Sequence, residues 1–171
     1  MRIKDFEKVA KRHKQWLEGR KGGKRANLRG LSKVELDFSG KDFSYANIRN
    51  MGLVVTNFVG SKFKGANLRK ADLRGTDCTN ADFQGANMWG VTLWYAIFKG
   101  ANLWYTKLWG SSLEQVNLVG ANFYKTKIKV DTLKAQVAFT PVSCHVEYTE
   151  DLQIELTNKL LEHVYMCNIG G

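Results

Sequence analysis

A period of five residues is the feature that most constrains how this chain can fold. It is clearest over residues 66–90, which read ANLRK ADLRG TDCTN ADFQG ANMWG. A large apolar residue stands at the centre of each unit, and the same register extends in both directions from Leu28 to Leu133. Of these 22 central positions, 21 are apolar in a chain that is 44% hydrophobic, so the period is a property of the fold.

A period of five fits neither the 3.6 residues of a helical turn nor the two-residue alternation of a flat strand. The chain is therefore expected to turn once per unit and to form a squared coil with four sides. The central residue, and the small residue two positions before it, should point inward. Asn or Asp precedes the centre in 13 units, and these residues and Gly suit tight or left-handed corners. Residues 26–135 would then form about 5.5 coils, each rising about 4.8 Å.

The pattern A[DN]Lxx resembles the pentapeptide-repeat family. This resemblance implies an all-β solenoid, a right-handed quadrilateral β-helix, over about two thirds of the chain. The opening is similar to that of small phage and bacterial members, since it combines His13, Trp16-Leu17, Gly19, Gly22-Gly23 and then RANL at 25–28. Repeat folds are scaffolds that carry different surfaces, so the resemblance predicts the fold more specifically than the function.

Residues 1–25 and 136–171 flank the repeats. The first segment predicts an N-terminal capping helix and a linker, with a core-facing His13 that makes one hydrogen bond. The second predicts a strand over 142–148 and a helix that starts near Thr149, which either caps the coil or dimerises. C-terminal helices often mediate dimerisation in the family, so the resemblance implies a homodimer formed through Leu152, Ile154, Leu156, Leu160, Leu161, Val164 and Tyr165.

Two lysines interrupt the first coil. Lys33 takes a central position and Lys41 takes a small-residue position. Because a buried, unpaired lysine is costly, either the backbone leaves the register here or the side chains reach solvent at the open end. We expect a local irregularity of the backbone beneath the cap.

The net charge of +10 is divided unevenly along the chain: +7 over residues 1–25, +7 over 26–135 and −4 over 136–171. A basic body of this kind predicts an acidic or polyanionic partner. The charged N-terminus is unlike a signal peptide, no apolar run is long enough for a membrane span, and three cysteines make no disulfide framework. We therefore expect a protein of the bacterial cytoplasm. The opening motif also suggests that a phage could encode it.

The position after each central residue points outward, and residues 20 apart should stack on one face. Four of the five tryptophans take such positions on consecutive C-terminal coils. Clustered exposed aromatic residues mark interfaces, although aromatic pairs also stabilise neighbouring strands, and both interpretations stay open. The predicted partner-binding residues are Arg29, Arg49, Arg69, Trp89, Trp94, Tyr95, Trp104, Tyr105, Trp109 and Tyr124.

No sequence motif indicates catalysis or a cofactor. The chain lacks a P-loop, GxSxG and a dinucleotide fingerprint. Cys144 or His145 with His163 and Cys167 would supply at most three zinc ligands, so no metal site is predicted, and Cys78 should be an inert core residue. The sequence therefore predicts a non-catalytic scaffold that binds a protein and inhibits or modulates it. Nucleic-acid binding through the Arg and Trp face is the first alternative. A DNA mimic acting on a topoisomerase is the second, and the positive net charge disfavours it.

Overall fold

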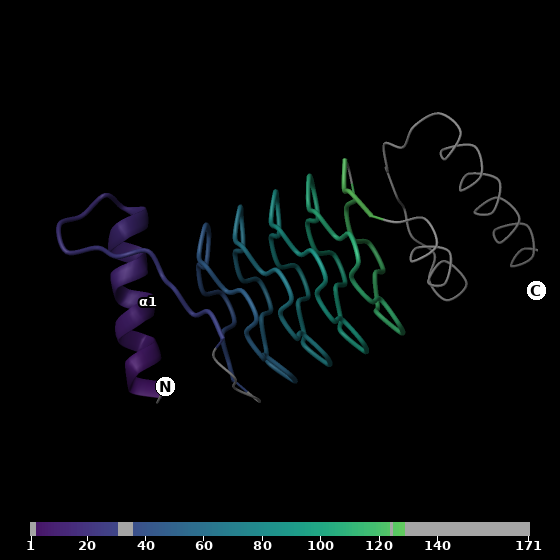
Figure 1. Ribbon diagram of the computed structural model, residues 1–171, viewed down its shortest axis with the longest axis horizontal. Coiled ribbons are helices and arrows are strands. Elements are labelled where there is room, and N and C mark those ends of the chain that lie inside the picture. Colours follow the sequence, from purple (N-terminus) through teal and green to yellow (C-terminus); the bar gives the residue numbers. More distant parts are fainter. Residues whose placement is uncertain (1–2, 31–35, 124, 129–171) are drawn as a thin grey trace, which may run out of the picture.

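The computed structural model describes residues 3–30, 36–123 and 125–128, where one helix is followed by a stack of squared coils (Figure 1). Sixteen isolated parallel bridges each join residues 20 positions apart, the first pairing Asn27 with Asn47 and the last pairing Lys107 with Lys127. The 20-residue coil is therefore confirmed, and these residues form a quadrilateral β-helix. The predicted boundary at residue 135, the strand and helix beyond it, and the seven predicted dimerisation residues lie outside the described residues.

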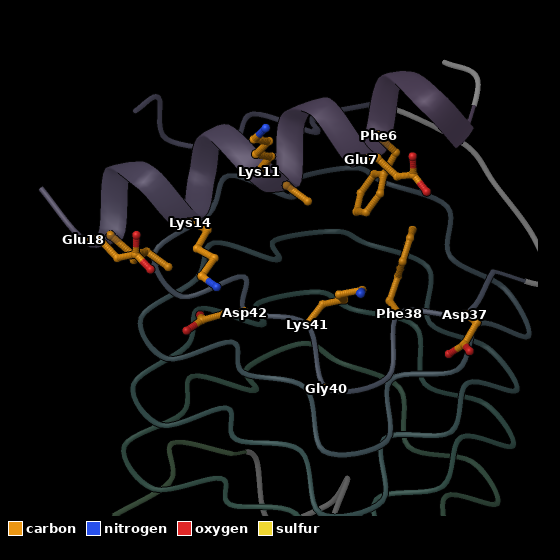
Figure 2. A pocket seen from close by; sticks show the side chains of 12 residues that line it. Phe6, Glu7, Lys11, Lys14, Glu18, Asp37, Phe38, Gly40, Lys41 and Asp42 are labelled. Carbon is orange, nitrogen blue, oxygen red and sulfur yellow. The ribbon is translucent and has the colours of Figure 1, made fainter. Parts of the chain in front are cut away.

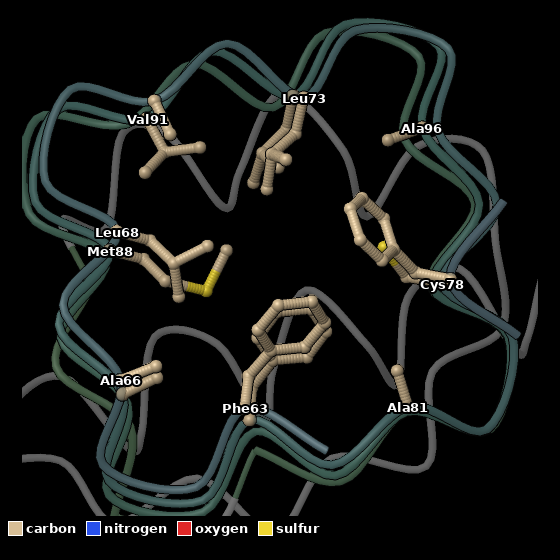
Figure 3. Close-up of a cluster of buried hydrophobic side chains, with 14 of the residues drawn as sticks. Phe63, Ala66, Leu68, Leu73, Cys78, Ala81, Met88, Val91 and Ala96 are labelled. Carbon is tan, nitrogen blue, oxygen red and sulfur yellow. The ribbon is translucent and has the colours of Figure 1, made fainter. Parts of the chain in front are cut away.

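The core is a column of inward side chains that runs through the middle of the coils. Central and small residues both point inward, as predicted, and both are buried. Figure 3 shows the four sides in projection, with Phe63 on one, Leu68 and Met88 on the next, then Leu73, and Cys78 opposite Leu68. Equivalent rings stack from coil to coil, since Phe63 and Phe83 lie 4.8 Å apart between centroids at an interplanar angle of 6°. Each coil thus buries its apolar residues within itself and against the elements next to it in the stack.

Most corners are hydrogen-bonded turns, and each described corner has one residue in the left-handed region. The amide of Ser61 donates to the carbonyl of Phe58 at 2.9 Å, and Gly60 between them has a φ of 64°. A positive φ at the third residue of a turn is the geometry that favours Gly. The same position is nevertheless left-handed where it holds Val55 or Tyr95, with φ values of 54° and 60°.

The Asn and Asp residues before the centres serve a different purpose from the one predicted. They lie on the sides of the coil, at the bridge positions, and not at the left-handed corner position. Their side-chain oxygens accept a hydrogen bond from the backbone amide two residues later, as Asp77 does from Thr79 at 2.9 Å. This contact orients the chain into the turn. The left-handed backbone predicted at these residues is found at the corner position instead, so that prediction was wrong.

Helix α1, Ile3–Leu17, precedes the first coil and lies at the end of the stack (Figure 1). Its Phe6 is buried and stacks on Phe38 of the first coil, with centroids 4.1 Å apart. The helix ends at a left-handed Gly19, as a C-terminal cap requires. His13 is buried, and its Nδ1 accepts a hydrogen bond from the amide of Ala26 at 3.1 Å, which confirms the prediction for this residue.

Lys41 keeps the backbone register of the repeat. Its amide donates to the carbonyl of Phe38 in the usual turn, and its carbonyl accepts from Lys62 in the next coil. The side chain is exposed in the space between α1 and the first coil (Figure 2). The expected irregularity of the backbone is therefore wrong at Lys41, because the open end lets the ammonium group reach solvent. Lys33 lies outside the described residues.

Candidate interaction surface

The four sides of the coil differ sharply in charge. We number the sides as faces 1 to 4. The last two residues of each five-residue unit form the corner that leads to the next face. Face 1 comprises 26–30, 46–50, 66–70, 86–90, 106–110 and 126–128, and face 2 comprises 51–55, 71–75, 91–95 and 111–115. Face 3 comprises 36–40, 56–60, 76–80, 96–100 and 116–120, and face 4 comprises 41–45, 61–65, 81–85, 101–105, 121–123 and 125.

Face 1 carries six basic residues and no acidic residue, namely Arg29, Arg49, Arg69, Lys70, Lys107 and Lys127. Faces 2, 3 and 4 together carry six basic and six acidic residues in the described ranges, and these charges cancel. Face 1 therefore carries a net charge of +6, whereas face 4 carries +2 and faces 2 and 3 carry −1 each. Such an arrangement concentrates the electrostatic potential and attracts an anionic partner to that side.

The corner between faces 1 and 2 carries the predicted arginine column. Arg29, Arg49 and Arg69 occupy the same position in successive coils, and the Nε atoms of Arg49 and Arg69 are buried. The stems of these two side chains therefore lie against the corner. In the next coil Trp89 takes their place, with the guanidinium carbon of Arg69 4.8 Å and the ammonium nitrogen of Lys70 5.4 Å from its ring centroid. These cation–π contacts link adjacent coils.

Aromatic residues border face 1 at its C-terminal end on both corners. Trp109 follows Trp89 on the corner with face 2, and it is 52% exposed. Trp104 and Tyr105 lie on the corner between faces 4 and 1, where the ammonium of Lys125 lies 5.9 Å from the centroid of Tyr105. Lys107 stands on the flat of face 1 between the two corners. This end of the face thus combines exposed rings with cations.

Trp94 and Tyr95 do not belong to this arrangement. They occupy the corner between faces 2 and 3, one full side away from face 1, and Tyr95 is 62% exposed. The structure thus separates the predicted binding residues into a group that borders face 1 and a pair that does not. Tyr124 lies outside the described residues.

Three of the face 1 cations, Lys70, Lys107 and Lys127, are absent from the predicted set. Lys70 stands on a corner, whereas Lys107 and Lys127 stand on the bridge positions, where the earlier coils carry Asn27, Asn47, Asn67 and Asn87. The sequence prediction rested on the position that follows each central residue. It therefore missed the change from Asn to Lys at the bridge positions along the flat of the face. Reading the bridge column at an interval of 20 residues would have found it.

Cations on the other faces are partly neutralised by carboxylates. On face 2 the guanidinium of Arg74 forms an ion pair with Asp72 at 2.7 Å. The hydrogen bonds from Arg74 hold the pKa of the Asp72 carboxyl below its usual value. The arginines of face 1 have no such partner on their own face, which strengthens its contrast with the rest of the molecule.

No reactive centre is found within the described residues. They contain no group of three or more residues suited to a metal ion, and no helix long and apolar enough to cross a membrane. Burial raises the pKa of the Cys78 thiol to about 12, so this cysteine is inert as predicted.

A cavity of about 690 Å³ lies between α1 and the first coil (Figure 2). Its walls mix apolar and charged side chains of both signs, among them Phe6, Phe38, Lys11, Lys41, Glu7 and Asp42. Because four carboxylates and three ammonium groups share this lining, it favours neither an anionic nor a cationic ligand.

Comparison with known proteins identifies the repeat. A model of the pentapeptide-repeat family matches eight copies, over residues 56–90 and 96–129. The repeats over these residues match the pentapeptide-repeat family. No curated protein sequence matches it. Among solved structures, it is similar to a pentapeptide-repeat protein of the Arabidopsis thaliana thylakoid lumen, with 28% identity over 65% of this chain and 77% of the other, and a TM-score of 0.62.

Two further solved structures are similar to part of this chain. A pentapeptide-repeat protein of Nostoc PCC 7120 is 25% identical over 70% of this chain and 99% of the other, with a TM-score of 0.42. The plasmid-mediated fluoroquinolone resistance protein QnrB1 is 13% identical over 60% of this chain and 72% of the other, with a TM-score of 0.42.

Proposed function

We propose that this protein is a non-catalytic interaction scaffold that binds an anionic macromolecule through face 1 and the aromatic side chains that border it. The supporting observation is the charge distribution, because face 1 holds six cations and no carboxylate while the other described faces are neutral in sum. The rigid stack of coils keeps these groups at fixed spacings, which lowers the entropy lost on binding.

The resemblance of the opening to small phage and bacterial members suggests the biological setting. There the scaffold would bind a protein in a bacterial cytoplasm and inhibit or modulate it, and residues 136–171 would join two copies. An acidic protein surface with an aromatic-binding pocket would complement Trp109 and Lys107. The alternative in which the chain mimics DNA gains no support from the charges, because faces 2 and 3 each carry a net charge of only −1 in the described ranges.

A pair of charge-matched variants tests whether face 1 is the binding surface. Arg49→Gln with Lys107→Gln removes two cations from face 1, and Lys62→Gln with Lys99→Gln removes two exposed cations from faces 4 and 3. Both variants reduce the net charge equally. The immobilised proteins are used to capture partners from a bacterial lysate, with and without nuclease treatment, and the captured proteins are compared by mass spectrometry.

We expect the wild type and the control variant to retain the same partner and the face 1 variant to lose it. Equal retention by all three proteins would show that face 1 is not the binding surface. Partner proteins that survive nuclease treatment would be bound directly, whereas proteins lost on treatment would be held through nucleic acid.

A further inference from the structure

We infer that the ligand of face 1 is a single-stranded nucleic acid, whose phosphates lie along the arginine column and whose bases stack on the tryptophans at the C-terminal end. This inference rests on the proposed function, because it names the chemical class of partner that the same surface binds. It is carried by the composition of the face, by the regular spacing of its cations and by the position of its aromatic rings.

The side chains that face 1 presents are cations, amides and aromatic rings. The amides form a row on the flat of the face, and the Nδ2 of Asn47 donates to the Oδ1 of Asn27 at 3.2 Å. The aliphatic residues of this face all point inward and are buried. Arginine and aromatic residues are common at both kinds of interface, but lysine is depleted at protein–protein interfaces, whereas interfaces with nucleic acids are polar and strongly positive. The composition of face 1 is therefore closer to that of a nucleic-acid interface.

The cations of face 1 repeat with the coil. Arg29, Arg49 and Arg69 stand on three successive coils, about 4.8 Å apart. Like charges that face one another on adjacent strands repel, and no carboxylate on face 1 offsets this repulsion. A ligand with one charge at each of many regular positions can neutralise the whole column, which a single anion cannot do. Phosphodiester backbones are ligands of this kind.

The aromatic rings distinguish a single strand from a duplex. Trp109 and Trp104 border face 1 on opposite corners, near Lys107 on the flat between them. In a duplex the bases are already stacked on one another, whereas those of a single strand can stack on exposed aromatic side chains. Cationic tracks that end at exposed rings are typical of proteins that bind single strands without sequence preference.

The cationic track extends past the arginine column toward the C-terminal end. At the N-terminal end, Arg25 adds a cation on the opposite corner, between faces 4 and 1, where its Nε donates to the carbonyl of Tyr45. At the C-terminal end the track reaches Lys127, five coil intervals from Asn27, or about 24 Å. This length is suited to a binding site within the range of about 4–16 nucleotides that single-strand-binding folds cover.

Fluorescence anisotropy with a labelled oligodeoxythymidine of about 12 nucleotides tests the inference on the full chain. The variants are Arg49→Gln with Arg69→Gln on face 1, Lys62→Gln with Lys99→Gln as the charge-matched control, and Trp109→Ala. Each is titrated between about 50 and 300 mM salt, and circular dichroism checks that the coils are intact.

The wild type should bind with an affinity that falls steeply as salt rises. Loss of two phosphate contacts should lower the slope of log K against log salt by about 1.4 in the face 1 variant and leave it unchanged in the control. Trp109→Ala should weaken binding on the order of tenfold, because one stacked base is lost, without changing the slope. A duplex of equal length should bind more weakly than the single strand.

Three results would overturn the inference: no binding at about 50 mM salt, equal losses in the face 1 and control variants, or tighter binding of the duplex with no effect of Trp109→Ala. If the oligonucleotide does not bind while a protein from nuclease-treated lysate is captured through face 1, the proposed function stands and only the class of partner is wrong. If neither ligand depends on face 1, both proposals fall.

Discussion

The Asp77 side chain shows why the repeat accepts either Asn or Asp before its central residue. Its Oδ1 accepts a hydrogen bond from the amide of Thr79 at 2.9 Å, and the Oδ1 of Asn57 accepts one from Val59 at 3.0 Å in the preceding coil. Only an oxygen is needed at this point, and both side chains supply it. The position therefore fixes the backbone of the turn and leaves the charge of the residue free to vary from face to face.

Four buried hydroxyl groups, those of Ser61, Thr106, Ser111 and Thr126, are satisfied in a similarly repetitive way. The Oγ of Ser61 donates to the carbonyl of Phe38 at 2.7 Å, and the Oγ1 of Thr106 donates to that of Phe83 at 2.8 Å. In both cases the acceptor lies 23 residues earlier, in the preceding coil. The preference for Ala, Ser or Thr at the small inward position follows, since a short hydroxyl side chain fits and finds a carbonyl within reach.

His13 predicts a pH dependence of stability. Its burial lowers the pKa of the imidazole, while the backbone of Ser44 and the carboxylate of Asp42 act in the opposite direction. Below an unfolded-state pKa of about 6.5, the unfolded chain binds a proton that the folded chain resists, so stability falls as the pH falls. We expect the urea midpoint to be constant above about pH 7 and to decrease between about pH 6.5 and 5.

The matched variant for this prediction is His13→Asn, whose side-chain oxygen can accept the hydrogen bond from Ala26. It should lose the decrease in the urea midpoint over the same pH range. Because His145 and His163 are present in both proteins, the difference between the two pH profiles isolates His13. Parallel profiles would show that His13 titrates in the folded protein as it does in the unfolded chain.

At the scale of the element, α1 packs on the first coil through the buried ring of Phe6, with Val9 and Ala10 partly buried against the same core. Phe6 stacks on Phe38 and also lies 5.9 Å from Phe43, measured between centroids. Phe6→Ala should therefore release α1, since loss of a buried aromatic side chain removes about 3–5 kcal/mol. Hydrogen exchange should become faster over residues 3–17 and stay slow over 56–123, because each coil depends mainly on its neighbours.

The exposed neighbour Glu7 provides the control for this prediction, and Glu7→Ala should leave hydrogen exchange unchanged. If exchange instead becomes faster through every coil, α1 is required for the whole solenoid and not only for its end. If Phe6→Ala has no effect at any position, the predicted capping role of residues 1–25 is wrong.

The elements were largely predictable because the constraint repeats. One apolar residue in register could be an accident, but 21 apolar centres in register indicate a chain that turns once every five residues. The prediction for Lys41 failed at the end of the stack, where no preceding coil covers the position and a lysine can reach solvent without disturbing the backbone. The five-residue period predicts the interior of a solenoid better than its ends, because the ends contact elements outside the repeat.

At the scale of the whole molecule, the site was harder to predict than the fold. The position that follows each central residue identified Arg49 and Trp109, but it also included Trp94, which lies on another corner. Lys107 was missed because it stands in a different register position on the same face. A binding surface combines residues from several register positions on one side, so it becomes visible only when charges are summed by face.

The concentration of charge on face 1 also predicts how salt affects the stability of the molecule. Repulsion along the arginine column acts over about 4.8 Å, and raising salt from about 0.05 to 0.5 M shortens the screening length to roughly this distance. Wild-type Tm should therefore rise with salt by about 2–4 °C, equivalent to about 1 kcal/mol for a chain of this size. The measurement is thermal unfolding by circular dichroism in a series of sodium chloride concentrations.

The two charge-matched variants separate this effect from that of net charge. Arg49→Gln with Arg69→Gln should flatten the dependence of Tm on salt, because two of the three like charges in the column are removed. Lys62→Gln with Lys99→Gln should keep the wild-type slope, although it lowers the net charge by the same amount. Equal slopes in both variants would mean that the total charge governs the response, and that its concentration on one face has no energetic consequence for the folded state.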